Sequence, residues 1–203
     1  MKDVFIVILD QYADWEAASI ASWLNQLEDF TIKTVSINTK PIHSIGGFTT
    51  IPDYSIEDAC QKEFAALILI GGNSWRTDAA AKVSVLVKQA QKQKAVISAI
   101  CDATVYLGTL GLLNNAKHTS NQLQDLQTYA GSRYTGANHY VEIQAIRDEL
   151  LVTANGTANV EFAREISLAL KSMPEAEITR WYNFYKLGYY DTLKQELRNG
   201  DEQ

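Results

Sequence analysis

Cys101 combines a reactive side chain with a position that favours chemistry. It lies in Ala-Ile-Cys-Asp-Ala, residues 99–103, where an apolar run ends and a helical pattern begins with almost no loop between them. The same strand–turn–helix geometry exposes the nucleophilic serine of many hydrolases. The helix that follows would offer unpaired N–H groups and a partial positive charge, which stabilise a thiolate and lower the pKa of a thiol below about 8.5. We therefore expect Cys101 to act as a nucleophile.

The alternative for Cys101 is a structural role, because cysteine is among the residue types most often buried. Cys60 lies in residues 56–61 without such a turn, and we interpret it as structural. The two thiols form no CxxC pair and cannot build a disulfide framework. This cysteine usage indicates free thiols in a reducing cytoplasm.

Glu16 is the carboxylate that we expect beside Cys101. It follows the apolar run at residues 4–9, in the first turn of the next helical segment. If the strands at 4–9 and 95–100 are parallel neighbours, both end at the same edge of the sheet and the two side chains can meet. A carboxylic acid there could donate a hydrogen bond to the thiolate or relay a proton. An acid favoured only by the helix dipole is the alternative, and Asp14 is explained by an N-cap role.

A glycine pair, Gly71 and Gly72, follows the apolar run at residues 65–70. It predicts a tight turn between a strand and a helix, or a close approach of backbone N–H groups to an oxyanion forming beside Cys101. The glycines match neither GxGxxG nor a P-loop, so we do not expect nucleotide binding.

Histidine is the usual general base of a cysteine hydrolase. The chain has three histidines, His43, His118 and His139. His118 follows the helix expected after Cys101 and is the candidate catalytic partner, whereas the other two are interpreted as surface or structural side chains. Because the three are widely separated in the sequence, we expect no metal site.

The elements that position these residues alternate between strands and helices. Apolar runs predict buried strands, and apolar spacings of three and four predict helices. This alternation predicts an α/β fold, a flavodoxin-like three-layer sandwich with a mostly parallel central sheet. We expect strands at residues 4–9, 30–37, 65–70, 95–100, 140–146 and 150–154, a hairpin within 41–55, and helices at 15–27, 78–93, 103–113, 122–130, 159–171 and 175–198.

Pro174 marks the expected boundary between an α/β domain at residues 1–173 and a helical C-terminal tail at 174–203. The tail is rich in aromatic residues at helical spacing, and Gly188 weakens or kinks its helix. An aromatic stripe of this kind packs either on its own domain or on a dimer partner.

The composition limits the classes of partner. The 203 residues carry a net charge of −6 without a cluster of Lys and Arg, so we expect neither nucleic-acid binding nor binding to anionic membranes. No apolar run approaches the roughly 18–20 residues that span a bilayer. The first run is short and is bracketed by Asp3 and Asp10, which argues against a signal peptide.

Several ordered motifs resemble those of the ThiJ/PfpI superfamily, whose fold is similar to that of class I glutamine amidotransferases. The resemblance covers about the first 170 residues. Its motifs are the run at 4–9 leading to residues 14–17, residues 45–47 to 52–53, residues 68–72, residues 99–103, residues 111–113 with Thr119, and residues 152–157 before 161–162. The resemblance implies that Cys101 is the nucleophile and Glu16 the acid that hydrogen-bonds it, with backbone N–H groups of Gly72 and Asp102 around the sulfur. It also implies a homodimer that needs no cofactor.

The chain departs from this family at one position. Many members carry a Thr-Thr-His type sequence after the cysteine helix, where this chain has Thr-Ser-Asn. Asn121 therefore occupies the histidine position, and His118 is displaced by three residues. The departure weighs against a Cys–His dyad and against the protease activity attributed to some relatives.

Three functions stay open at this point. The first is a cysteine-nucleophile enzyme, a protease-like or amidase-like hydrolase that acts on a small carbonyl, amide or peptide substrate. The second is a protective protein of redox or carbonyl stress, in which Cys101 is reversibly oxidised. The third is a ligand-binding or oligomerisation module with an inert cysteine. A fold resemblance does not choose among them.

Overall fold

The apolar runs form the centre of a seven-stranded sheet in the computed structural model, which describes residues 1–200. The strands follow the order β5-β2-β1-β6-β7-β9-β8, and all neighbours are parallel except β8 and β9. The sheet strands are β1 (Lys2–Val7), β2 (Phe30–Ser36), β5 (Tyr54–Ser55), β6 (Ala66–Leu69), β7 (Val96–Ile100), β8 (Ala145–Asp148) and β9 (Leu151–Ala154).

Helices cover both faces of this sheet. The helices of the chain are α1 (Asp14–Leu24), α2 (Ile56–Ala59), α3 (Ser84–Gln93), α4 (Asp102–Thr109), α5 (Leu123–Ala130), α6 (Asn159–Leu170), α7 (Glu175–Leu187) and α8 (Tyr189–Gly200), with short 3-10 helices at Asp78–Val83, Gly131–Arg133 and Ala137–His139, and all but α7 and α8 belong to the layers around the sheet. Within residues 1–200, none of the helices is both long enough and apolar enough to cross a lipid bilayer.

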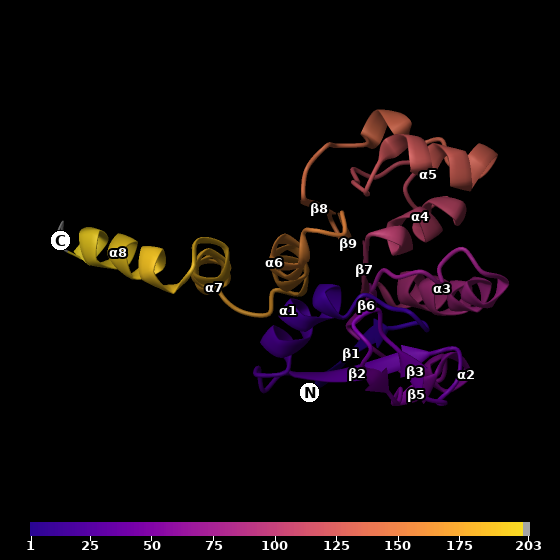
Figure 1. The fold of residues 1–203 in the computed structure, drawn as a ribbon, viewed down its shortest axis with the longest axis horizontal. Coiled ribbons are helices and arrows are strands. Elements are labelled where there is room, and N and C mark those ends of the chain that lie inside the picture. Colours follow the sequence, from indigo (N-terminus) through magenta and orange to yellow (C-terminus); the bar gives the residue numbers. More distant parts are fainter. Residues whose placement is uncertain (201–203) are drawn as a thin grey trace.

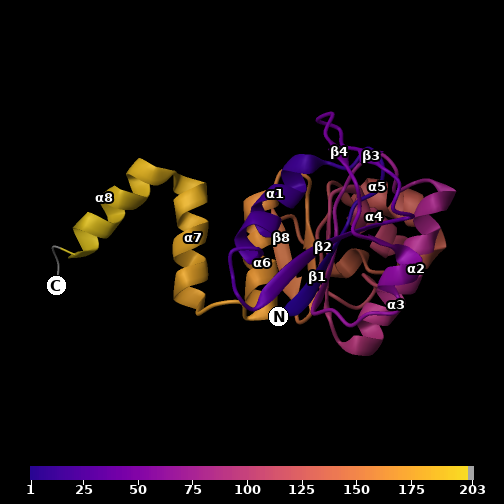
Figure 2. The same ribbon diagram turned by 90° about the horizontal axis from the view of Figure 1, so that it is seen from below.

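Alternate side chains of β1 enter two separate cores. Phe5 and Val7 are buried on the face covered by α3 and α4, while Val4 and Ile6 are buried on the face covered by α1 and α6 (Figure 1; Figure 2). A strand that is covered on both faces gains from apolar residues at every position, because each side chain leaves water. The predicted three-layer α/β fold with a mostly parallel sheet is confirmed.

Several predicted elements differ in extent. β8 begins at Ala145 and not at residue 140, because only four residues pair with β9. The helix predicted over 78–93 begins as a 3-10 helix before α3. The helix after Cys101 ends at Thr109, two residues before Gly111, whose φ of +75° leaves the helical region. β5 and α2, which are only two and four residues long, were not predicted.

The hairpin predicted within 41–55 consists of β3 (Ile42–His43) and β4 (Thr49–Thr50). Asp14 anchors it, since its carboxylate accepts hydrogen bonds from the Ser44 hydroxyl at 3.0 Å and from the Gly46 N–H at 3.1 Å. The N-cap role predicted for Asp14 is therefore wrong: Ala13 is the N-cap of α1, and the Asp14 side chain bonds the hairpin. This contact fixes the hairpin against the start of α1.

The C-terminal segment forms two helices, separated at Gly188. α7 packs against α6, and Trp181 lies on Trp23 of α1 with their ring centroids 4.8 Å apart. α8 projects away from the sheet, as both views show (Figure 1; Figure 2). Residues 201–203 of the predicted tail lie outside the described residues.

Candidate active site

Cys101 is held in an unusual backbone conformation at the end of β7. Its φ of 59° and ψ of −130° lie outside the region that side-chain-bearing residues prefer, and it directly precedes α4. Such a conformation costs on the order of 1–3 kcal/mol and is typical of functional sites. The Cys101 N–H donates to the Ala154 carbonyl at 3.0 Å, which ties the turn to β9. The sharp strand-to-helix turn that the sequence predicts is therefore present.

The Cys101 sulfur is half-buried and receives two hydrogen bonds. The Asn121 side-chain amide donates to Sγ at 3.2 Å, and the backbone N–H of Asp102 also donates to it. The other end of the Asn121 amide is fixed as well, because its Oδ1 accepts from the Gly156 N–H at 2.8 Å. Both contacts stabilise negative charge on the sulfur.

Glu16 lies in the same site and is fully buried. Its Oε2 accepts a hydrogen bond from the Gly71 N–H at 2.8 Å. Its Oε1 is buried and has no oxygen or nitrogen partner within the described residues. A Cβ placed on Gly156 would lie 3.1 Å from this Oε1 and 3.0 Å from the Cys101 sulfur, so both atoms face the same small space. The expected meeting of Glu16 and Cys101 therefore occurs.

The route by which Glu16 reaches Cys101 differs from the predicted one. β1 and β7 are not neighbours, because β6 lies between them. Gly71 follows β6 at this edge, and a Cβ there would lie 2.5 Å from Glu16 Oε2 and 2.6 Å from the Cys101 Cβ. Only glycine leaves room for the two side chains to meet across the end of β6.

The ionisation of this pair is strongly perturbed. Burial raises the pKa of Glu16 to about 7, although the hydrogen bond from Gly71 opposes the shift. Burial and the Glu16 charge raise the pKa of Cys101 to about 11, against the lowering effect of the hydrogen bonds from Asn121 and Asp102. The expected lowering of the Cys101 pKa is therefore wrong, because burial and the neighbouring carboxylate outweigh the helix N-terminus. Because the two groups face each other, they titrate as a coupled pair.

A pocket of about 490 Å³ opens beside this pair. Gly72 lines it, and its N–H makes no hydrogen bond to any other described residue. The neighbouring bonds, from Ala13 N–H to Gly71 and from Asn73 N–H to Gln11, leave that N–H unused. The pocket is lined by Ala13, Trp15, Glu16, Ile45, Gly72, Asn73, Arg76, Cys101, Asp102 and Asn121.

Arg76 is a residue of this site that sequence reasoning missed. Its guanidinium binds the Asp102 carboxylate through Nε and Nη2 and also binds Asp125. It thereby fixes the residue whose N–H faces the sulfur. No local signal marks Arg76, since its partners lie 26 and 49 residues away. Gly156 was also missed, although its place just beyond the carboxyl end of β9 could have suggested it.

The structure places His118 apart from Cys101, in a buried cluster of its own. Its Nδ1 lies 2.8 Å from the Ala116 carbonyl oxygen and its Nε2 lies 2.7 Å from the Tyr134 hydroxyl. Burial lowers the pKa of His118, which favours the neutral ring. With both ring nitrogens engaged, the geometry gives no support to a catalytic role for His118. His139 is exposed, and His43 belongs to the β3–β4 hairpin.

We expect His118→Ala to change stability and not turnover. The substitution leaves a cavity and removes a partner from Tyr134, which together should lower the free energy of unfolding by about 2–4 kcal/mol. Turnover per folded molecule should change less than about tenfold. Urea unfolding followed by fluorescence measures the first effect, with His139→Ala as the exposed control. A hundredfold loss of turnover in a folded His118→Ala protein would instead show that His118 is catalytic.

No group of three or more metal-ligating side chains occurs among the residues that the structure describes. Cys60 lies in the turn after α2, and burial raises its pKa. It has none of the hydrogen-bonding partners that surround Cys101.

Known proteins resemble this chain in sequence and in fold. The uncharacterized protease YdeA of Bacillus subtilis (strain 168) is 42% identical over 192 residues, which cover 94% of each chain. The uncharacterized protease YoaZ of the same organism is 33% identical over 192 residues, which cover 91% of each. The crystal structure of a thiJ/pfpI family protein from Bacillus anthracis aligns with a TM-score of 0.87 at 30% identity, covering 97% of this chain and 96% of that one. The sequence model of the DJ-1/PfpI family matches residues 2–169, and the chain belongs to the DJ-1/PfpI family.

Proposed function

We propose that this protein is a cysteine-nucleophile hydrolase, protease-like or amidase-like, that acts through Cys101 on a small carbonyl, amide or peptide substrate. One observation carries the proposal: the buried carboxyl of Glu16 faces the Cys101 sulfur across the space beside Gly156, next to a pocket that Gly72 lines. A proton carrier with a pKa near the working pH is best suited to general acid–base catalysis. The pKa of about 7 makes Glu16 such a carrier.

The reaction follows from these contacts. As the Cys101 sulfur bonds to the substrate carbonyl carbon, its proton passes to Glu16 Oε1 and the carbonyl electron pair moves to oxygen. The Gly72 N–H donates to this oxyanion, and Asp102 supplies the second backbone N–H. When the carbon–nitrogen bond of an amide breaks, the leaving nitrogen takes the proton from Glu16 and a thioester remains. Water then adds to the thioester, giving the carboxylic acid and restoring the thiol.

Asn121 distinguishes this site from a Cys–His dyad. A carboxamide cannot accept the thiol proton at neutral pH, and its Nδ2 already donates to the sulfur. In this proposal, Asn121 stabilises the thiolate and Glu16 alone carries the proton. The two Bacillus subtilis relatives bear the name protease, which agrees with a hydrolase.

A second candidate function is reversible oxidation of Cys101 in a protective role, without proteolysis. Three groups surround the sulfur: the Asn121 amide, the Asp102 N–H and the Glu16 carboxyl. Peroxide would oxidise the thiol to a sulfenic acid and release water, and these groups could hydrogen-bond the added oxygen and favour this state, which a thiol reductant reverses. The absent side chain of Gly156 leaves space next to the sulfur.

We further propose that the chain works without a cofactor as a homodimer in the reducing cytoplasm. In this proposal, residues 1–173 form the catalytic α/β domain and residues 174–203 a helical tail that takes part in dimer contacts. Support for the tail contact comes from exposed aromatic and aliphatic side chains, Tyr185, Tyr189, Tyr190 and Leu197.

A screen of small aldehydes, amides and peptides tests the two candidate functions. For a hydrolase, we expect at least one substrate class to turn over, and prior alkylation of the enzyme with iodoacetamide to abolish that turnover. For the redox function, mild peroxide should add oxygen to Cys101 before Cys60, and reductant should reverse it, without turnover of any substrate. Mass spectrometry locates both modifications. A Cys101 that reacts with neither reagent would contradict both functions.

A further inference from the structure

A second, larger cavity shares the lining residue Asn121 with the Cys101 pocket. This cavity, which we call the amide groove, has a volume of about 1090 Å³. Asn121 lines both cavities, and its amide nitrogen lies 3.2 Å from the sulfur, so the groove begins within one side chain of the nucleophile. It is lined by Thr119, Ser120, Asn121, Gln122, Leu123, Gln124, Gln127, Tyr140, Glu142, Ile143, Gln144 and Asn155.

The groove has an unusual chemical composition. Half of its twelve lining residues are carboxamides, three carry a hydroxyl, and its single charged side chain is Glu142. No Lys or Arg lines it. A carboxamide both donates and accepts hydrogen bonds, so it matches the N–H and C=O groups of a peptide. A lining with one negative charge and no positive charge repels a carboxylate and attracts a cation.

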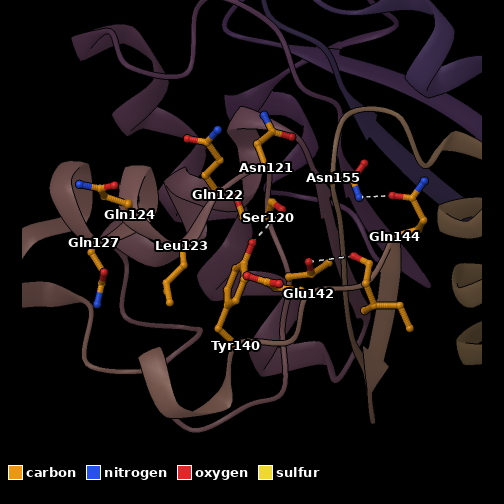
Figure 3. A pocket seen from close by; sticks show the side chains of 12 residues that line it. Ser120, Asn121, Gln122, Leu123, Gln124, Gln127, Tyr140, Glu142, Gln144 and Asn155 are labelled. Carbon is orange, nitrogen blue, oxygen red and sulfur yellow. Dashed lines mark hydrogen bonds between the residues drawn. The ribbon is translucent and has the colours of Figure 1, made fainter.

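The two walls of the groove differ in how their side chains are engaged (Figure 3). On one wall, Gln144 and Asn155 bond each other at 2.5 Å, which fixes both amides. On the other, Gln122, Gln124 and Gln127 lie along the start of α5, and their side chains have no partner among the described residues. The carboxylate of Glu142 likewise has neither a hydrogen bond nor an ion pair within residues 1–200. The groove thus combines a rigid wall with free donors and acceptors.

We infer that the amide groove binds an extended peptide segment of the substrate of Cys101, with a basic side chain placed near Glu142. The inference rests on the proposed function and narrows its substrate class. The unpaired amides of Gln124 and Gln127 would bond the peptide backbone, and Glu142 would select the charge of the side chain. A small aldehyde would fill only the 490 Å³ pocket and leave the groove unused.

Two chloroacetyl tetrapeptides that differ only in a central Lys or Glu provide the test, because each alkylates a thiol without requiring turnover. The rate of Cys101 modification is measured by mass spectrometry and divided by the rate with iodoacetamide, which is too small to extend along the groove. We expect the Lys probe to react about fivefold faster than the Glu probe in wild type, because an exposed ion pair contributes up to about 1 kcal/mol. Salt at 0.5 M should reduce the ratio, because it screens exposed charges.

Substitutions in the groove distinguish the contribution of the Glu142 charge to probe reactivity from that of the glutamine amides. Glu142→Gln should bring the Lys-to-Glu ratio close to one, and Glu142→Lys should reverse it. Glu149→Gln is the control, because Glu149 lies in the turn between β8 and β9 and does not line the groove. It should leave the wild-type ratio unchanged. The double variant Gln124→Ala/Gln127→Ala should slow both peptide probes about equally relative to iodoacetamide.

Equal rates for the two probes in wild type, or a ratio that survives in Glu142→Gln, would overturn the inference about the groove. The proposed function would still stand if iodoacetamide modified Cys101 in the same experiment. A Cys101 that resists iodoacetamide as well would overturn the proposed function, and with it the inference about the groove.

Discussion

Replacement of Cys101 by serine is expected to lower turnover by at least about 10³-fold while the protein keeps its fold. Serine has nearly the same shape, and it can occupy the same backbone conformation as the cysteine. Its hydroxyl is a much weaker acid than a thiol, so Glu16, with a pKa of about 7, cannot remove its proton effectively. Turnover of the substrate found in the screen and thermal unfolding should be measured on the same preparation.

Cys60→Ser is the matched control for this variant. It makes the same chemical change at a half-buried cysteine that lacks the Asn121 and Asp102 hydrogen bonds, so its turnover should stay within about twofold of wild type. Full turnover in a folded Cys101→Ser protein would show that the observed reaction does not use Cys101. Equal losses in both variants would indicate a general effect of removing a thiol.

The second large effect is expected for Glu16→Gln. Loss of a general acid–base group lowers turnover by about 10²–10⁴-fold. In wild type, alkylation of Cys101 should rise only on the alkaline side, because burial and the Glu16 charge raise the pKa of the thiol to about 11. In Glu16→Gln the carboxylate charge that opposes thiolate formation is gone, so this rise should move to lower pH. The rate of iodoacetamide modification between pH 5 and pH 10 measures both profiles.

The same variant should be more stable than wild type at alkaline pH. The pKa of Glu16 is higher in the folded protein than the value of 4.5 expected for the unfolded chain, so folding favours the protonated form. This stabilisation is fully present below about pH 4.5 and is lost as the pH rises through about 7. The shift corresponds to at most about 3 kcal/mol of unfolding free energy. Glu16→Gln should therefore be more stable than wild type by up to this amount at pH 8, and should show no such gain at pH 4. A difference in Tm that does not depend on pH would show that Glu16 is not the titrating group.

The sequence by itself determined the central strands and the turn that carries Cys101. Both are local properties: a strand covered on two faces needs apolar side chains in succession, and a nucleophile turn needs a strand and a helix with no loop between them. The absence of histidine at position 121 was also visible in the sequence. These features depend on neighbours along the chain, which periodicity and composition report directly.

The tertiary structure alone decided which distant side chains meet. The strand order places β6 between β1 and β7, so Glu16 reaches Cys101 only because Gly71 has no side chain. The same packing directs His118 to Tyr134 and brings Asn121 to the sulfur. The raised pKa values of Glu16 and Cys101 arise from burial, which is a collective result of packing. No sequence pattern encodes these contacts, because their free energies depend on atoms that are brought together only when the whole sheet has formed.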